Sequence, residues 1–182
     1  MRQFCSAGVP MGVFETLIDA VNAATTQQGV IGRLKLWTRD AGLEEKTSDI
    51  EGQFLADPTL PGLIIREGRE IFGILSRRAL FGTISVPYGR EVFIKRPLRE
   101  MAAKMDTAPL MLPASTTVPA ALKFSLTRPD ELRFEPVLVH SAEGVKLLEM
   151  HTLMIAQANL LEEALGSRDR LLEKIKAVVG GR

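Results

Sequence analysis

The chain has 182 residues, enough for one ordinary domain or for two small similar units, and 46% of them are hydrophobic and 25% are charged. This composition is that of a folded globular protein and excludes a disordered chain. The formal charge of +1 excludes a strong field for nucleic acid or anionic membranes, and one cysteine with two histidines excludes a disulfide within the chain and a zinc site. The single cysteine favours the cytoplasm, and the balanced charge favours no nucleic-acid partner. We expect no membrane partner, because no segment approaches the roughly 20 apolar residues of a membrane span.

The first predicted element is a helix between Pro10 and Gly29. Its apolar residues recur at spacings of 1, 3 and 4, which places them on one helix face: Val13, Phe14, Leu17, Ile18, Val21 and Ala24. A weak alternation at residues 34–38 predicts a strand. We assign residues 1–45 to an N-terminal helical extension.

A second helix is predicted after Ser48–Asp49, which offers an N-cap, and it ends at Asp57–Pro58 because the residue before a proline avoids the α region. Two apolar strands follow, at residues 63–65 and 71–75, joined by a turn at Glu67–Gly68. A further helix begins after Ser76. The predicted order is therefore helix, strand, strand, helix.

The same order returns later in the chain. A helix with Pro119 in its first turn precedes strands at residues 137–139 and 145–148, a turn at Glu143–Gly144 joins these strands, and a helix begins near His151. Corresponding positions, such as Ser76 and Glu149, lie 71 to 73 residues apart. Two such units are expected to bury their sheets and helices against each other as a pseudo-twofold pair.

Residues 46–158 resemble a tandem cystathionine-β-synthase (CBS) domain pair, or Bateman module. The stretches "FLADPTLPGLIIREGREIFGILSRRALF" and "FSLTRPDELRFEPVLVHSAEGVKLLEMHTLM" carry the resemblance, and "PYGREVFIKRP" looks like the linker of CBS-like input regions in bacterial signalling proteins. The resemblance implies an α/β (α+β) fold of two pseudo-symmetric β-α-β-β-α repeats with an N-terminal helix and a long C-terminal amphipathic helix. We place the first repeat with its linker at 46–100, the second at 101–158, and the C-terminal helix and tail at 159–182.

The resemblance also implies a ligand site between the repeats. Members of the family typically bind AMP, ATP or S-adenosylmethionine there, and many dimerise. Their pattern of Gly, Ser or Thr, and Asp at three-residue steps is matched by Gly73 and Ser76, but Ala79 stands at the position of the ribose-binding Asp. In the second repeat a carboxylate, Glu149, would face a phosphate. The candidate ligand residues are Gly73, Ser76, Arg77, Arg78, Ile64, Pro136 and Glu149.

The apolar strand before Ser76-Arg77-Arg78 can also be interpreted from physical chemistry alone. Free N–H groups at a helix start, a hydroxyl and two cations form a corner that binds anions such as phosphate. Alternatively, Ser76 only caps the helix and the arginines are solvated. The segment "PYGREVFIKR" has two readings as well, a surface that stacks on a nucleotide and a connector between the repeats. No spacing indicates a catalytic constellation or a metal site, so we do not expect an enzyme.

The C-terminal region predicts a long amphipathic helix. Apolar residues recur at alternating spacings of 3 and 4 from Met154 onward, the period of a coiled coil. Arg168 stands at one seam position, and Gly166–Ser167 indicates either a kink or a break between two helices. This helix either pairs in a homodimer or lies on its own domain, and it is where a downstream signalling protein would bind. Two functions follow: a non-catalytic sensor module, or a dimerisation scaffold that has lost its ligand.

Overall fold

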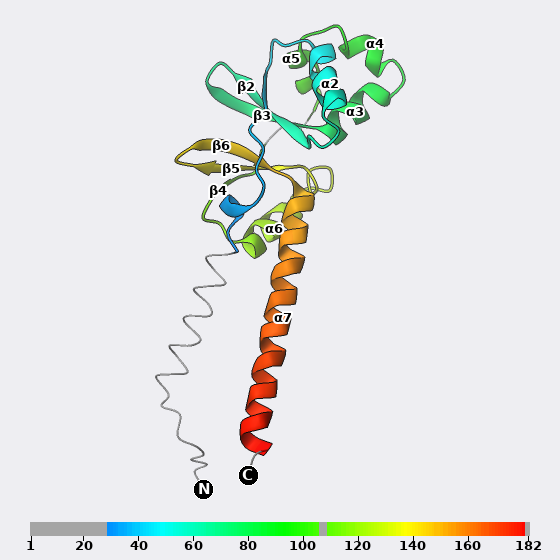
Figure 1. The fold of residues 1–182 in the computed structure, drawn as a ribbon. Coiled ribbons are helices and arrows are strands. Elements are labelled where there is room, and N and C mark those ends of the chain that lie inside the picture. Colours follow the sequence, from blue (N-terminus) through cyan, green and yellow to red (C-terminus); the bar gives the residue numbers. More distant parts are fainter. Residues whose placement is uncertain (1–28, 106–108, 181–182) are drawn as a thin grey trace.

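The fold consists of two similar units, as Figure 1 shows in the computed structural model, which describes residues 29–105 and 109–180. A short 3-10 helix, η1 (Ile31–Arg33), precedes both units. The first unit contains β1 (Asp40–Gly42), α2 (Thr47–Ala56), β2 (Gly62–Glu67), β3 (Glu70–Ser76), α3 (Arg77–Ser85), α4 (Gly89–Phe93) and α5 (Leu98–Ala102). The second contains β4 (Met111–Pro113), α6 (Val118–Leu126), β5 (Val137–Ser141), β6 (Gly144–Leu148) and α7 (Met150–Gly180).

Each unit has one three-stranded sheet of the same topology. The central strand, β2 or β5, pairs in parallel with the short strand before it and antiparallel with the strand after it. The hairpins turn at Gly68 and Gly144, whose φ angles of +59° and +115° favour glycine. The predicted α/β class with two repeats of like topology is thereby confirmed.

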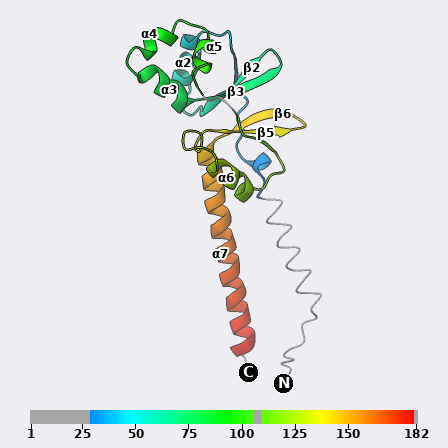
Figure 2. The same ribbon diagram turned by 180° about the vertical axis from the view of Figure 1, so that it is seen from behind.

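The two sheets face each other, and the helices lie on the outer sides (Figures 1 and 2). Between the sheets, four apolar side chains form a buried cluster, two from each unit: Ile64, Ile74, Leu138 and Leu147. Each unit also has its own core between its sheet and its helices. The central strands are therefore apolar on both faces, which explains their continuous hydrophobic runs.

The segment before α2 differs from the prediction. Residues 34–38 form no strand; Trp37 makes a single bridge with Leu147 of β6, and Ile31 is buried in the core of the second unit. The strand in this region is β1, which begins at Asp40 and belongs to the first sheet although it precedes residue 46. The helix predicted between Pro10 and Gly29 lies outside the described residues.

The predicted N-cap of α2 is wrong, because α2 begins at Thr47 without a side-chain cap. The N–H groups of Thr47 and Ser48 instead donate to the carbonyl oxygens of Arg96 and Ile94, at 3.0 and 2.9 Å. The segment "PYGREVFIKRP" therefore packs on α2 of its own repeat and does not run between the two repeats. Arg90 of α4 forms a bidentate ion pair with the buried Glu51 of α2, and this ion pair holds α4 against α2.

The last helix, α7, is continuous over 31 residues and crosses position 158 without interruption. The alternative that Gly166–Ser167 breaks the region into two helices is wrong, because α7 continues through both residues. The helix runs out of the body, so that its second half stands free in both views (Figures 1 and 2). Among the helices of the described ranges, none is both long enough and apolar enough to span a membrane.

Gly166→Ala is expected to stabilise the helix. A Cβ at position 166 would meet no atom within 4 Å, and alanine lowers the entropy cost of helix formation by about 1 kcal/mol relative to glycine. Circular dichroism at 222 nm during heating measures the change, since the free half of α7 contributes strongly to the signal. Loss of helical signal in the variant would contradict a continuous helix at this point.

Candidate functional site

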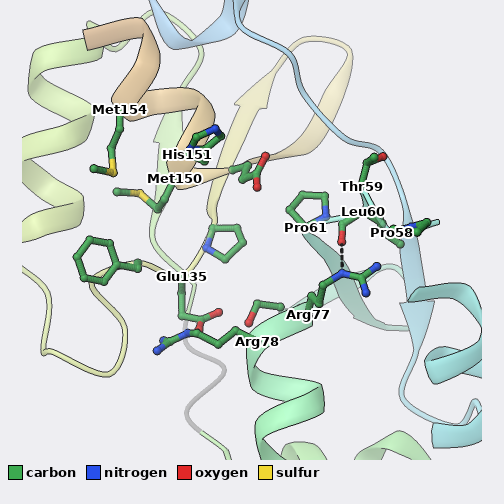
Figure 3. A pocket seen from close by; sticks show the side chains of 14 residues that line it. Pro58, Thr59, Leu60, Pro61, Arg77, Arg78, Glu135, Met150, His151 and Met154 are labelled. Carbon is green, nitrogen blue, oxygen red and sulfur yellow. Dashed lines mark hydrogen bonds and ion pairs between the residues drawn. The ribbon is translucent and has the colours of Figure 1, made fainter. Parts of the chain in front are cut away.

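A cleft of about 460 Å³ lies between the two repeats (Figure 3). Its lining has two similar halves. In each half, the loop before the central strand meets the start of the helix that follows the last strand. The halves are Pro58–Pro61 with Ser76–Arg78, and Phe134–Pro136 with Glu149–His151 and Met154. The cleft therefore shares the pseudo-twofold symmetry of the fold.

Ser76 is the N-cap of α3, as predicted, and is almost completely buried. Its hydroxyl oxygen accepts a hydrogen bond of 3.0 Å from the N–H of Ala79. The N–H of Arg77 donates to the carbonyl oxygen of Pro61 at 2.9 Å. Two N–H groups of this helix start thus have partners within the protein, and fewer remain for an anion than the sequence suggested.

The side chain of Arg77 is directed toward carbonyl oxygens. Its Nη2 donates to Phe54 O and Asp57 O at 2.5 and 2.6 Å, and its Nε donates to Leu60 O at 3.2 Å. The guanidinium also lies 5.2 Å from the ring centre of Phe54 and 5.7 Å from that of Phe81. Arg77 therefore binds the C-terminal end of α2 and shapes one wall of the cleft.

Arg78 connects the two repeats. Its Nη2 lies 2.7 Å from Oε1 of Glu135 and donates at 2.5 Å to the carbonyl oxygen of Glu131. Glu135 is well covered, whereas most of the Arg78 side chain is exposed. Figure 3 shows the two side chains side by side at the border of the cleft. The exposed guanidinium of Arg78 therefore borders the cleft, and the carboxylate of Glu135 is its ion-pair partner.

Local hydrogen bonds fix both loops that line the cleft. In the first, the hydroxyl and the N–H of Thr59 donate to the Asp57 carboxylate and lower the pKa of Asp57. In the second, Arg128 donates to Ser125 O and to Glu135 O, at 3.3 and 2.6 Å, and its burial lowers the pKa of Arg128. The two loops are thus held in place without a ligand.

The remaining predicted residues divide into two groups. Pro136 and Glu149 line the cleft, and Glu149 directly precedes α7 as Ser76 precedes α3, with the Thr152 hydroxyl 3.5 Å from its carboxylate. Ile64 and Gly73 lie outside the lining, because both sit within strands, away from the strand ends that border it. The structure therefore brings together five of the seven predicted residues.

A second hollow, of about 570 Å³, shares Arg78 and Glu135 with the first. Its other lining residues are mainly small or apolar: Ala79, Gly82, Thr83, Val86, Met105, Glu131 and Leu132. Ala79, at the family position of the ribose-binding Asp, faces this hollow and supplies no polar group. In the described ranges, no group of three or more His, Cys, Asp or Glu side chains is placed to hold a metal ion.

Several residues of the site escaped the sequence prediction. Glu135 and the carbonyl of Glu131 bind Arg78 from the other repeat, and the first turn of α7 contributes Met150 and His151. One signal was available: Pro61 and Pro136 each stand directly before the central strand of their repeat. The matching positions of the two prolines mark the two loops that line the cleft.

Several CBS-domain proteins are among the solved structures with a similar fold. A CBS-domain containing protein from Agrobacterium tumefaciens is 13% identical over 71% of this chain and 94% of its own, with a TM-score of 0.56. A putative acetoin utilization protein from Vibrio cholerae is 15% identical over 74% and 93%, with a TM-score of 0.53. CBSX2, a CBS-pair protein from Arabidopsis thaliana, in complex with AMP, is 17% identical over 72% and 98%, with a TM-score of 0.51.

No protein-family model matches the sequence, and no curated protein matches it. The likeness to the solved structures concerns the fold. The chain has the fold of a tandem CBS-domain pair, as the sequence resemblance indicated.

Proposed function

We propose that this chain is a non-catalytic regulatory module that binds a small ligand between its repeats and passes the binding event on through α7. One observation carries the proposal: the first turn of α7 is itself a wall of the cleft. A ligand that contacts Met150 or His151 touches the same helix that runs out of the body. If α7 has two positions, such a ligand shifts the equilibrium between them toward the position that it binds more tightly. The size of the shift depends on the difference between the two affinities.

For the ligand we propose an adenosine nucleotide or a related compound, such as AMP, ATP or S-adenosylmethionine. The family resemblance and the AMP complex of CBSX2 support this class. In the cleft, the exposed guanidinium of Arg78 suits a phosphate, which would take the place of the Glu135 carboxylate. Arg77 contributes by shaping the loop, since its donors are directed to carbonyl oxygens.

A second function, a scaffold without a ligand, also has support. Ala79 offers no ribose contact, and Glu149 places a negative charge where the second repeat would meet a phosphate. In either function we place the protein in the cytoplasm and propose that a signalling protein is contacted through α7.

Thermal unfolding with AMP, ADP, ATP and S-adenosylmethionine separates the two functions. A compound that binds only the folded protein at 100 times its Kd raises the free energy of unfolding by about 2.7 kcal/mol. We expect such a shift for at least one compound and its loss in Arg78→Ala. Arg69→Ala, which removes an exposed arginine that does not line the cleft, is the matched control and should keep the shift.

The outcomes differ for the two functions. No shift with any of the four compounds would favour the scaffold. A shift that survives Arg78→Ala would show that a compound binds elsewhere than beside this guanidinium.

A further inference from the structure

The free half of α7 has an apolar face that nothing in the described chain covers. Leu160 is the last residue of the helix that packs against the core of the second unit. From residue 161 to 177, all residues except Gly166 are exposed. The large apolar side chains among them are 47% to 57% exposed: Leu161, Leu165, Leu171, Leu172 and Ile175. Most helical stability comes from packing such a face, and an exposed apolar face of this kind marks an interaction site.

The spacing of the residues along the helix divides this face into a central row and two flanking rows. The centre follows the coiled-coil period: Leu161, Leu165, Arg168, Leu172 and Ile175. One flank is apolar, with Ala164 and Leu171 directly before central residues. The other flank is charged, with Glu162, Asp169 and Lys176 directly after central residues. The flanks of a coiled coil set the choice and the direction of the partner helix.

A parallel pair of these helices would be poorly matched. In a parallel pair each flank meets the opposite flank of the other helix, so Ala164 and Leu171 would lie beside the charged residues Asp169 and Lys176. The two Arg168 side chains would lie in the same layer at the centre of the pair, where their like charges would repel each other.

An antiparallel pair of the same helices is complementary. Each flank then meets its own equivalent in reverse order, so the apolar flanks meet each other. On the charged flanks, Glu162 of each copy lies near Lys176 of the other. Arg168 shares its layer with Leu172 of the second copy, and the two Asp169 carboxylates at the centre lie beside the two Arg168 guanidiniums. Within each helix, Arg168 already pairs with Asp169 at 3.0 Å.

We propose that the free half of α7 binds the same segment of a second copy of this chain as an antiparallel helix pair. The proposal goes beyond the proposed function, because it requires no ligand and concerns a surface outside the cleft. The segment from 161 to 180 is about 30 Å long, so the two CBS pairs would stand at opposite ends of the helix pair.

Disulfide trapping tests both the partner and the direction in the full chain, with Cys5→Ser as background so that no native thiol competes. An antiparallel pair brings Leu165 of one copy beside Ile175 of the other. We expect a mixture of Leu165→Cys and Ile175→Cys proteins to give the mixed disulfide dimer, and Leu165→Cys alone to give none. Strong cross-linking of Leu165→Cys with itself would overturn the antiparallel arrangement.

Charge exchange gives an independent measurement. Lys176→Glu should raise the dimer dissociation constant about fivefold, because two attractive pairs become repulsive. Adding Glu162→Lys to the same chain should restore it. Light scattering and sedimentation provide the mass and the constant.

A matched pair of variants tests the face itself. Leu165→Asp with Leu172→Asp should give a folded monomer, since neither residue contacts the body, whereas Ser167→Asp on the opposite side should leave the dimer intact. A wild-type chain that stays monomeric at every concentration would overturn the proposal and assign the face to another segment or to another protein.

Discussion

Replacing Arg77 with alanine is expected to lower the free energy of unfolding by about 2 to 3 kcal/mol. The change removes the hydrogen bonds to the carbonyl oxygens of Phe54, Asp57 and Leu60 and leaves these acceptors without a charged donor. It also removes the guanidinium from the ring of Phe54. The loop between α2 and β2 should loosen, and with it one wall of the cleft.

Chemical denaturation of the purified protein measures this loss. Arg78→Ala is the matched control, because the side chain of this neighbouring arginine is largely exposed, so we expect its ion pair to contribute less, about 1 kcal/mol. Arg77→Lys should restore little, since an ammonium group has no planar fork to reach several carbonyl oxygens. Equal losses for Arg77→Ala and Arg78→Ala would show that the carbonyl bonds of Arg77 do not stabilise the fold.

Leu147→Ala is expected to cost about 3 kcal/mol and to weaken the contact between the two sheets. Leu147 is fully buried in the small cluster that joins the repeats, and the removal of a leucine side chain leaves a cavity there. Leu148→Ala is the matched control, because Leu148 faces the core of its own unit and is equally buried. Both variants should lose stability, but only Leu147→Ala should disturb the other repeat.

Trp37 reports this difference, because it is the one tryptophan of the sequence and its backbone pairs with that of Leu147. Trp37 also packs against the cluster between the sheets. We expect a red shift of its fluorescence in folded Leu147→Ala and none in folded Leu148→Ala. Identical emission of the two variants would contradict a role for Leu147 in holding the repeats together.

The sequence sufficed for those parts of the fold that depend on local patterns. The hairpins at Gly68 and Gly144 follow from apolar runs interrupted by a glycine, and the cap at Ser76 follows from a polar residue before a helix. The residue pattern did not locate β1 and β4, which only the family resemblance implied, because three residues are too few for a pattern. The start of α2 was misjudged because its capping groups come from Ile94 and Arg96, far along the chain.

The candidate site was predicted in position but not in detail. Ser76, Arg77 and Arg78 do border the cleft, yet the direction of each side chain depends on groups that no local pattern reveals. The partners of Arg77 are backbone carbonyls, which every residue has, and Glu135 lies in the other repeat, 57 positions from Arg78. Such pairings become visible only when the two loops are placed together.

The continuity of α7 has a mechanical consequence. A continuous helix of 31 residues is about 46 Å long, so a tilt of about 5° of the whole helix at its base would move its tip by about 4 Å. A change too small to break any contact in the cleft would be amplified at the far end to the size of a side chain. In this protein, the projecting helix and one wall of the cleft are the same piece of backbone.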